Sequence, residues 1–427
     1  MDNLEYLAKK GESSKKNKNL KSLPLFFTEK ELDQLSKKSI AIVGTNGKTS
    51  TAGFIFQYFL EAGISACRFT SPHLVQVNER IQTSSGLIKD KELVSYLDEV
   101  IKFEKKEGLV LGYFEALFLI CCKSFLDMQL EIFIVEAGIG GRLDTTSIIN
   151  SENVVLTNVG YDHTEILGES LEEILMEKIH ISSRVKNFFS GDTITEWKFG
   201  DLIRKELGLS LNKGVSSKSK GDYFVSIEPL KNGYHLFENR PRKEDFRLYN
   251  GALAQRVFST LSSQRGLKSN IAEMNFRSHF YLLNQFEKES GRFEIIHSND
   301  KTFKIIDGAH NSFAIPALKN FVSNEFPVDR FPRVECFLGI KTGKDFEGIL
   351  DALAFNNIRG EEAVYGISLI EGGTFRDQIN PETIAEYLTE IGVKYKYASL
   401  DDFHSYNEPS ILLGSLYLVG EYIKEFR

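Results

Sequence analysis

The feature that most constrains the fold of this chain is an apolar run that leads through a glycine-rich loop into an amphipathic segment. Ser39–Val43 (SIAIV) has the length and composition of a buried parallel strand. The loop that follows is Gly44-Thr45-Asn46-Gly47-Lys48-Thr49-Ser50. Apolar residues then recur at helical spacing as far as Gly63, a typical helix stop. A strand, a glycine loop and a helix in this order predict the first unit of a parallel α/β sheet.

The same loop has the chemistry of a phosphate-binding site. Glycines let backbone N–H groups approach phosphate oxygens closely, and the helix N-terminus adds a favourable dipole. Lys48 supplies a positive charge, and the Thr49 hydroxyl suits Mg²⁺ or a phosphate oxygen. The widest form of the pattern wants glycine at position 42, where Ile42 stands instead. The alternative is a tight glycine turn without a ligand, but we expect residues 44–50 to bind the phosphates of a nucleotide.

Further strands and helices alternate along the chain, which predicts a parallel α/β sheet with helices on both faces. A chain of 427 residues is too long for one ordinary core, so we expect two domains with a boundary near residue 290. Residues 187–249, with Trp197 and the apolar fragment Tyr223–Ile227, are either a small β subdomain or an insertion. The expected strands are Ile132–Val135, Val154–Leu156, Phe303–Ile306 and Cys336–Ile340, and the expected helices are Tyr113–Leu130, Asn250–Arg265 and Pro381–Ile391.

Charge and composition exclude several classes of function. The formal net charge of −7 gives no general attraction for nucleic acid. No apolar run approaches the roughly 20 residues of a membrane span, and the N-terminus lacks the apolar region of a secretory signal. The four cysteines form no C-x-x-C pair and have the pattern of reduced core thiols. We therefore expect a cytoplasmic enzyme.

Polar residues follow the predicted strands where open α/β sheets bind ligands, at the carboxyl ends. Glu136 follows one strand and opens a run with three glycines, Arg142 and Asp144, and Asp162-His163 follows the next strand. Mg²⁺ prefers carboxylate and phosphate oxygens, and a single histidine is more often structural. The shared sheet edge nevertheless makes Glu136 and His163 candidate metal ligands. Lys178 lies on a predicted helix, where a lysine is normally solvated.

Taken together, these motifs resemble the folylpolyglutamate synthase/dihydrofolate synthase family of the Mur ligase superfamily. The resemblance covers about residues 39–422. The phosphate loop alone would fit any Mur-type ligase, whereas the other motifs, in this order and spacing, are specific to the family. They are Thr70-Ser71-Pro72-His73-Leu74, Asn78-Glu79-Arg80-Ile81, Tyr113-Phe114-Glu115-Ala116, the run EAGIGGRLDTT from Glu136, Asp162-His163-Thr164 with Leu167-Gly168, Gly291-Arg292-Phe293, Asp307-Gly308-Ala309-His310-Asn311 and Gly414-Ser415-Leu416-Tyr417.

The resemblance implies an α/β fold: a Rossmann-like P-loop ATPase domain with a parallel sheet, residues 1–290, and a smaller C-terminal α/β domain, residues 291–427. It implies ATP and Mg²⁺ as the nucleotide and the metal, with Ser71, Glu136, His163 and Lys178 around the metal. The family carbamylates the lysine that Lys178 matches, which would turn a cation into a carboxylate-like ligand. Arg292 would reach the phosphates and Asp307 the ribose. We assign Asn250 to the nucleotide as well.

The resemblance also implies the substrate residues. His310 and Ser415 belong to the glutamate side, and Phe114 and Asp144 to the pterin pocket, although Asp144 could instead cap the next helix. We assign Arg80 and Thr145 to the substrate too. The chain departs from the family pattern in Ile179-His180 after the lysine, in Thr49, where the family often has glycine, and in residues 1–38.

The implied reaction is ATP-dependent attachment of L-glutamate to tetrahydrofolate or to dihydropteroate through an acyl phosphate, with Lys48, Lys178, His163 and Arg292 in catalytic roles. The expected enzyme is a C–N bond-forming ligase that acts as a monomer. One alternative is another Mur-type ligase, acting on a cell-wall or amino-acid polymer precursor. A second is a nucleotide-binding module without ligase activity, which would not need the Asp307 and His310 set. The sequence leaves open which folate activities are present and how long the polyglutamate product is.

Overall fold

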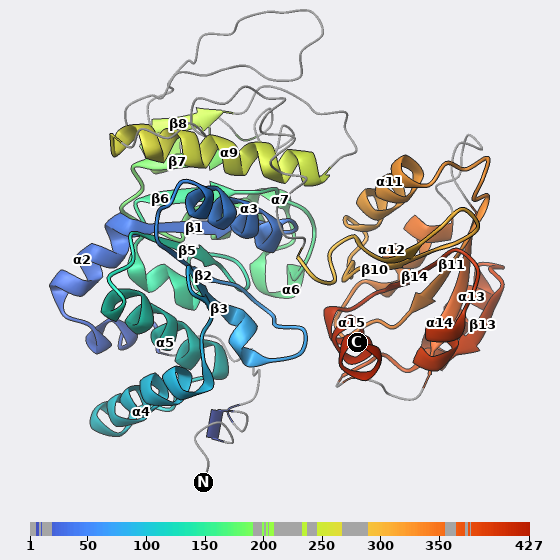
Figure 1. Ribbon diagram of the computed structural model, residues 1–427, viewed down its shortest axis with the longest axis horizontal. Coiled ribbons are helices and arrows are strands. Elements are labelled where there is room, and N and C mark those ends of the chain that lie inside the picture. The colour runs from blue at the N-terminus through green and yellow to red at the C-terminus, as the bar shows by residue number, and fades with distance from the viewer. Residues whose placement is uncertain are drawn as a thin grey trace, which may run out of the picture. The chain divides into compact units, whose positions relative to one another are not determined.

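The computed structural model describes residues 6–7, 10, 19–190, 199, 202–203, 205–208, 233–236, 246–266, 289–354, 364–371, 375 and 377–427. The chain divides into two compact units, each with its own sheet (Figure 1). The first comprises Met1–Ser71, Val77–Pro241 and Arg247–Phe286, and the second Pro72–Gln76, Arg242–Phe246 and Glu287–Arg427. Within the described residues, no helix combines the length and apolarity needed to cross a membrane.

The first unit is built on an eight-stranded sheet of order β4-β3-β2-β5-β1-β6-β7-β8. All pairs are parallel except β2–β3 and β3–β4, which are antiparallel and close one edge. β1 lies at the centre and is buried along its whole length, as its apolar sequence predicts. The strands are β1 Ser39–Val43, β2 Ala66–Phe69, β3 Ile81–Thr83, β4 Gly86–Leu87, β5 Ile132–Glu136, β6 Asn153–Leu156, β7 Asn187–Ser190 and β8 Gly233–Leu236.

Helices cover both faces of this sheet (Figure 1). Alternate residues of the central strands face opposite sides. One core cluster forms with α3 and α9, a second with α4 and α5, and a third with α7. The elements are η1 Leu23–Phe26, α2 Glu29–Lys38, α3 Lys48–Glu61, η2 Val77–Arg80, α4 Asp90–Glu107, α5 Tyr113–Asp127, η3 Thr145–Ile149, α6 Thr164–Leu167, α7 Leu171–Ile179 and α9 Phe246–Gln264.

The order of the strands determines which loops meet. β2, β5, β1 and β6 are consecutive, parallel neighbours in the sheet. Their carboxyl ends therefore lie along one edge, and the chain leaves each of them in a loop at that edge. This edge carries the phosphate loop after β1, the end of β5 at Glu136 and the loops that lead to Ser71 and His163.

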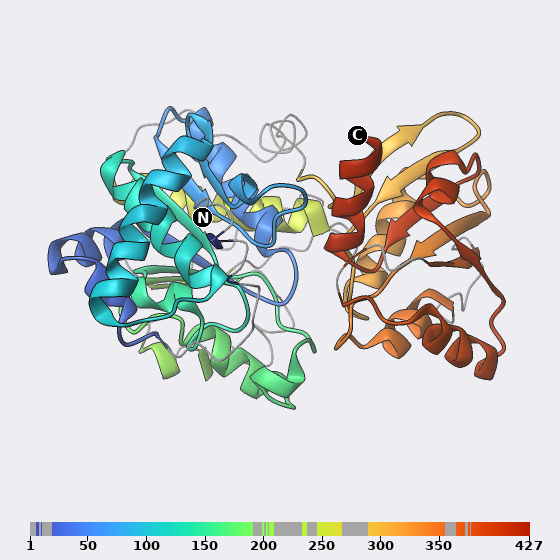
Figure 2. The ribbon, with the colours of Figure 1, turned by 90° about the horizontal axis from the view of Figure 1, so that it is seen from below.

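The second unit has a six-stranded sheet of order β13-β12-β11-β14-β10-β9, parallel except for the edge pair β9–β10. One face packs against α11, α12 and α13, and the other against α14 and α15 (Figure 2). The elements are β9 Glu294–Ser298, β10 Phe303–Ile306, α11 Ile315–Glu325, β11 Arg333–Leu338, α12 Phe346–Ala354, β12 Val364–Ile370, α13 Pro381–Glu390, β13 Tyr395–Ala398, α14 Leu400–Ser405, β14 Ser410–Leu413 and α15 Leu416–Phe426.

The predicted α/β class with parallel sheets is confirmed, with small shifts at the ends of elements. The helix expected from Asn250 begins at Phe246, and the strand expected at Cys336–Ile340 is β11, which begins at Arg333. Within residues 187–249, β7 and β8 extend the large sheet. This observation does not decide between a small β subdomain and an insertion. Trp197 and Tyr223–Ile227 lie outside the described residues. The boundary at residue 290 and the assignment of Mur-ligase-type domains stay predictions.

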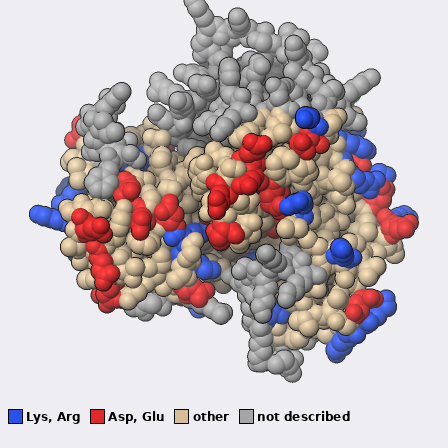
Figure 3. All heavy atoms as spheres, turned by 180° about the vertical axis from the view of Figure 1, so that it is seen from behind, with Lys and Arg blue, Asp and Glu red and all other residues tan. Residues whose placement is uncertain are grey.

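The cysteines and the surface charges add two observations. All four cysteines are buried and free, as core thiols should be, and the sulfurs of Cys67 and Cys121 are 3.7 Å apart. Figure 3 shows basic and acidic side chains intermixed over the described surface of one face. Any binding of an anionic ligand must therefore come from local groups.

Candidate functional site

The phosphate loop is held in shape by the chain that follows β6. The Thr45 hydroxyl donates to the Gly160 carbonyl (3.1 Å) and accepts from the Gly160 N–H (2.9 Å). The Asn46 N–H donates to the side chain of Asn158, and the Asn46 carbonyl accepts from Thr157 and Asn158. These bonds join residues more than 110 positions apart, so the loop is braced by tertiary structure.

Gly47 explains why the end of the loop must be glycine. It is the N-cap of α3 and has a φ of +79°, in the left-handed region that side chains disfavour. A Cβ atom there would also lie 2.8 Å from Oδ1 of Asn250, on α9. That buried Oδ1 accepts no hydrogen bond among the described residues. The structure thus brings Asn250 to the phosphate loop, where a bound nucleotide could satisfy it.

Two lysines donate to one carbonyl of this loop. Nζ of Lys48 lies 3.0 Å from the Gly44 oxygen and 3.1 Å from the Thr45 oxygen, and Nζ of Lys178 also lies 3.0 Å from the Gly44 oxygen. Lys178 is buried, in contrast to the solvated side chain that its helical position suggests. Burial, and after it the charge of Lys48, lower the pKa of Lys178 to about 7.

Glu136 joins three parts of the sheet edge. It is the last residue of β5, and its carboxylate is almost completely buried. Oε1 accepts from the Thr49 hydroxyl at 3.0 Å, and Oε2 accepts from the Ser71 N–H at 3.2 Å. The structure therefore brings together Glu136, Ser71 and the threonine of the phosphate loop, all of which carry the oxygen donors that Mg²⁺ prefers.

His163 lies on the same edge of the sheet, after β6. It is the N-cap of α6 and has a φ of +54°, a conformation that costs a non-glycine residue about 1–2 kcal/mol. Its ring nitrogens are 3.9 Å from a carboxylate oxygen of Asp162 and 3.6 Å from one of Glu165. The described residues contain no cluster of three or more His, Cys, Asp or Glu side chains arranged as a ready metal site. A shared metal for His163 and Glu136 stays a prediction.

The expected pterin residues lie beside Gly138. A Cβ atom on Gly138 would be 3.0 Å from Oδ2 of Asp144 and 3.3 Å from the ring of Phe114, so these two side chains are neighbours. Asp144 caps η3: Oδ1 accepts from the N–H and hydroxyl of Thr146. Oδ2 accepts from the N–H groups of Gly138 and Ile139. The capping role considered as an alternative is therefore present, and direct pterin recognition stays a prediction.

Arg80 and Thr145 are both buried in the first unit. The guanidinium of Arg80 lies over the ring of Tyr113, 5.1 Å from its centroid. The Thr145 hydroxyl has no hydrogen-bond partner in the described part of the chain. The contact of Arg80 and Thr145 with the substrate stays a prediction.

The second unit gathers its candidate residues around the ends of β10 and β14. Asp307 accepts from the N–H groups of Phe293 and Ala309, both at 2.7 Å. Burial raises the pKa of Asp307, although these bonds and Arg292 oppose the rise. His310 Nδ1 lies 2.7 Å from the Gly308 carbonyl, and Ser415 is the N-cap of α15. Gly308 and Gly291 are joined by a backbone bond, which links the Asp307 and Arg292 motifs.

Sequence reasoning missed the residues that support the site. Thr157 and Asn158 brace the phosphate loop, and the polar run TNVGYDH after a predicted strand was the available signal. Glu177 binds the glycine run at positions 138–144, and its sequence carried no such signal. Both contacts depend on pairing between distant segments, which local patterns do not show.

Comparisons with known proteins find relatives in sequence and in fold. No protein-family model matches the chain. It is 28% identical over 339 residues, 77% of this chain and 76% of the relative, to the dihydrofolate synthase/folylpolyglutamate synthase of Buchnera aphidicola subsp. Acyrthosiphon pisum. It is similar to E. coli FolC in complex with DHPP and ADP (TM-score 0.75, 22% identity, 100% of this chain and 97% of that chain). It is also similar to the bifunctional folylpolyglutamate synthase/dihydrofolate synthase of Yersinia pestis with AMPPNP and Mn (TM-score 0.74, 21% identity, 100% and 98%). The likeness to these solved structures shows a shared fold.

Proposed function

We propose that the chain is a member of the folylpolyglutamate synthase/dihydrofolate synthase family and an ATP-dependent ligase that attaches L-glutamate to a folate or to dihydropteroate. The observation that carries the proposal is the sheet edge of the first unit. There the phosphate loop lies beside Glu136, Ser71 and the buried Lys178. We propose that residues 1–290 form the Mur-ligase-type ATP-binding domain and residues 291–427 the C-terminal domain.

The residues present suit ATP and a divalent metal. Of the two solved relatives described above, one is in complex with DHPP and ADP and the other with AMPPNP and Mn. In this chain Glu136 and Ser71 would hold Mg²⁺, together with His163 and a carbamylated Lys178. The buried Glu136 carboxylate accepts from the Thr49 hydroxyl of the phosphate loop and from the Ser71 N–H, and it is a hard oxygen ligand beside this loop. When bound, Mg²⁺ neutralises charge on the phosphate oxygens.

The first chemical step activates the acceptor carboxylate. A carboxylate oxygen of the pteroate or folate forms a bond to the γ-phosphorus of ATP, and the bond from that phosphorus to the β–γ bridging oxygen breaks. ADP leaves, and the product is an acyl phosphate. Lys48 would hold the transferred phosphoryl group, and Arg292 would add a second cation. Asn250 and Asp307 would position the nucleotide.

The second step forms the amide. The amine of L-glutamate attacks the acyl carbon, a tetrahedral intermediate forms, and phosphate leaves as the nitrogen loses a proton. His310 and Ser415 would hold the incoming glutamate, and Phe114, Arg80, Asp144 and Thr145 the pterin side. Most of the catalysis comes from positioning and from stabilising phosphoryl charge, so no Ser-His or Cys-His nucleophile is needed. We propose a cytoplasmic monomer.

Phosphate release from ATP is the direct test. It should depend on both L-glutamate and a pterin substrate, and a panel of dihydropteroate, tetrahydrofolate and tetrahydrofolate polyglutamates would identify the acceptor. Release without an added pterin would favour a ligase for another acceptor or a simple ATPase. No release with any acceptor, together with tight ATP binding, would favour a nucleotide-binding module.

A further inference from the structure

The glycine run after β5 makes its closest approach to the end of α7. A Cβ atom on Gly141 would lie 2.4 Å from the carbonyl oxygen of Lys178 and 2.7 Å from that of Glu177. Real Cβ atoms do not approach backbone oxygens so closely, so only glycine allows this contact. The partner in this close backbone approach is the end of helix α7.

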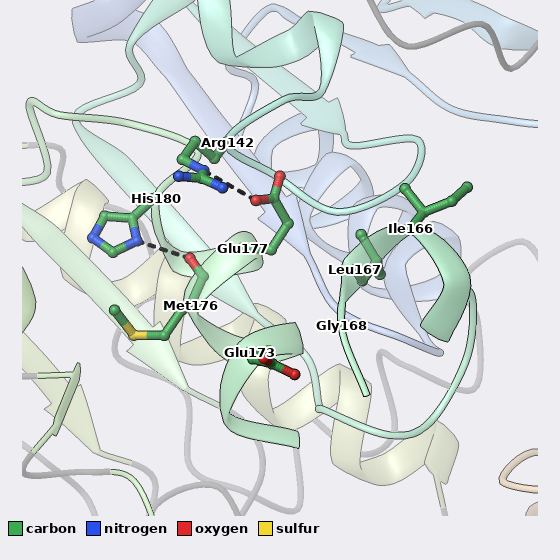
Figure 4. Close-up of a pocket in the computed structure, with 8 residues that line it drawn as sticks. All are labelled: Arg142, Ile166, Leu167, Gly168, Glu173, Met176, Glu177 and His180. Atoms are coloured by element: carbon green, nitrogen blue, oxygen red, sulfur yellow. Dashed lines mark hydrogen bonds and ion pairs between the residues drawn. The ribbon is translucent and has the colours of Figure 1, made fainter. Parts of the chain in front are cut away.

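Glu177 binds this loop at three points. Its carbonyl accepts from the Arg142 N–H at 2.8 Å. Its carboxylate accepts from the Leu143 N–H at 2.9 Å through Oε1. It also accepts from Arg142 Nε at 3.0 Å through Oε2, the contact that Figure 4 shows. We call these bonds, with the Gly141 contact, the Glu177 clasp. It joins the loop of the proposed pterin residue Asp144 to α7.

The clasp acts on the helical turn that carries Lys178. α7 is only nine residues long and ends at Ile179, and the last turn of a helix lacks part of its own hydrogen bonding. Lys178 extends from this turn, and its buried ammonium group reaches the Gly44 carbonyl of the phosphate loop. Because Glu177 and Lys178 are consecutive, a backbone fixed at Glu177 also fixes the starting point of Lys178.

The ion pair with Arg142 and the hydrogen bond from the Leu143 N–H do not contribute equally to the strength of the Glu177 clasp. The Arg142 side chain is 64% exposed and that of Glu177 9%, so water weakens the ion pair between them. The bond from the Leu143 N–H to Oε1 needs only an acceptor, which a neutral amide can also supply. The negative charge of Glu177 is therefore less important than its shape and its acceptor oxygen.

We propose that Glu177 is a positioning residue, which holds Lys178 at the metal and phosphate position through the Glu177 clasp. The inference rests on the proposed function, because it assigns Lys178 to the metal. A residue that orients a metal ligand typically changes metal affinity by about 10–100-fold when it is removed. Glu177→Ala should therefore weaken the metal-dependent part of nucleotide binding and leave the metal-free part unchanged.

Calorimetric titration of AMPPNP into the full chain, with and without Mg²⁺, measures these two parts separately. In Glu177→Ala the gain in affinity from Mg²⁺ should fall about tenfold or more, with metal-free affinity within about twofold of wild type. Glu177→Gln should keep the gain, because Gln retains the acceptor for the Leu143 N–H. Gly141→Ala should lose it with Glu177 intact, because the added Cβ displaces the end of α7.

Glu173→Ala is the matched control. Glu173 lies one turn earlier on α7 and accepts from the N–H groups of Glu169 and Ser170, so its loss weakens the helix start. It should lower Tm and leave the Mg²⁺ gain unchanged. A normal gain in Glu177→Ala, a lost gain in Glu177→Gln, or an equal loss in Glu173→Ala would overturn the proposal. If Glu177→Ala does not fold, Gly141→Ala and Glu177→Gln decide.

The binding experiment also separates the two proposals. It needs no pterin, no glutamate and no turnover. A wild-type chain without glutamate-dependent phosphate release, but with a Mg²⁺ gain that follows the pattern above, would reject the ligase and keep the clasp.

Discussion

Lys48 is held by two carbonyl oxygens of its own loop, and it makes no large contribution to the core. Lys48→Ala should therefore leave Tm nearly unchanged and reduce turnover by about 100-fold or more, since the side chain serves the transferred phosphoryl group. Thermal unfolding and phosphate release measure the two effects. A folded Lys48→Ala variant with near-normal turnover would refute the phosphate-loop assignment.

Lys178 should make stability depend on pH. Burial and Lys48 lower its pKa from 10.5 to about 7, so between these values the folded chain binds fewer protons than the unfolded chain. The free energy of unfolding should therefore rise as pH increases from about 7 towards 10.5. In Lys178→Met this component should be missing. Urea titrations of metal-free protein without bicarbonate test it, and Lys91→Met, at an exposed lysine, is the control and should keep the wild-type pH dependence.

The same shift bears on the predicted carbamylation of Lys178. Only a neutral amine reacts with CO₂, and with a pKa of about 7 a large fraction of Lys178 is neutral near neutral pH. Ile179, the departure from the family pattern, packs into the core with Ile174 and Leu175. With ¹³C-bicarbonate, wild type should give a carbamate NMR signal that Lys178→Met lacks. A bare ammonium in a nucleotide complex prepared with ample bicarbonate would reject the modification.

The two candidate roles of Asp144, capping η3 and binding the pterin, can be separated by mutation. Its oxygens accept four hydrogen bonds from the chain, and an amide at this position would place N–H groups against N–H donors. Asp144→Asn should therefore lower the free energy of unfolding by about 1–3 kcal/mol. If Asp144 also reads the pterin, folded Asp144→Asn should bind dihydropteroate more weakly and AMPPNP normally. Equal pterin affinity in the two proteins would leave only the cap.

Among helices and strands, the sequence pattern predicted an element well where the element's own residues determine it. β1 and α3 form as the apolar run and helical spacing predict, and β10 matches its expected bounds. The two-residue strand β4 and the edge strand β9 were missed, because short antiparallel edges have little pattern of their own. The contacts of Asn250 with Gly47, and of Glu177 with the glycine run, depend on packing between distant elements.

The predicted metal ligands are Glu136, at the end of β5, and His163, after β6. Glu136→Ala should abolish the effect of Mg²⁺ on nucleotide binding. It should also lower the free energy of unfolding by about 1–3 kcal/mol, because the half-buried Thr49 hydroxyl and Ser71 N–H lose their acceptor. His163, which is more exposed, should affect stability within about 0.5 kcal/mol when changed to alanine.

A nucleotide complex with Mg²⁺ or Mn²⁺ tests the ligands directly. Density for a metal that neither Glu136 nor His163 coordinates would refute this prediction. Matched measurements of turnover and urea unfolding in Glu136→Ala and His163→Ala would show whether rate is lost out of proportion to stability.

In the whole molecule, each unit has its own sheet and core, and each contains residues that the motifs assign to a function. The first unit supplies the phosphate loop and the metal residues, and the second supplies Arg292, Asp307, His310 and Ser415. Most of these residues follow a strand, which made them candidates in the sequence, whereas Lys178, on α7, and Arg292, before β9, were assigned from the family resemblance. The motifs could not predict how each set is held, for example by the two backbone N–H groups on Asp307.

The bracing of the phosphate loop by the chain after β6 also has a consequence for folding. The loop takes its shape from partners such as Asn158, 112 positions away, so an unfolded chain has no nucleotide site to offer. A ligand that binds only the native state stabilises it, by about 2.7 kcal/mol at a concentration of 100 times its Kd. AMPPNP should therefore raise Tm in proportion to the logarithm of its concentration, and Asn158→Ala should weaken this linkage. Nucleotide supply would then influence how much of the chain survives proteolysis as well as how fast it turns over.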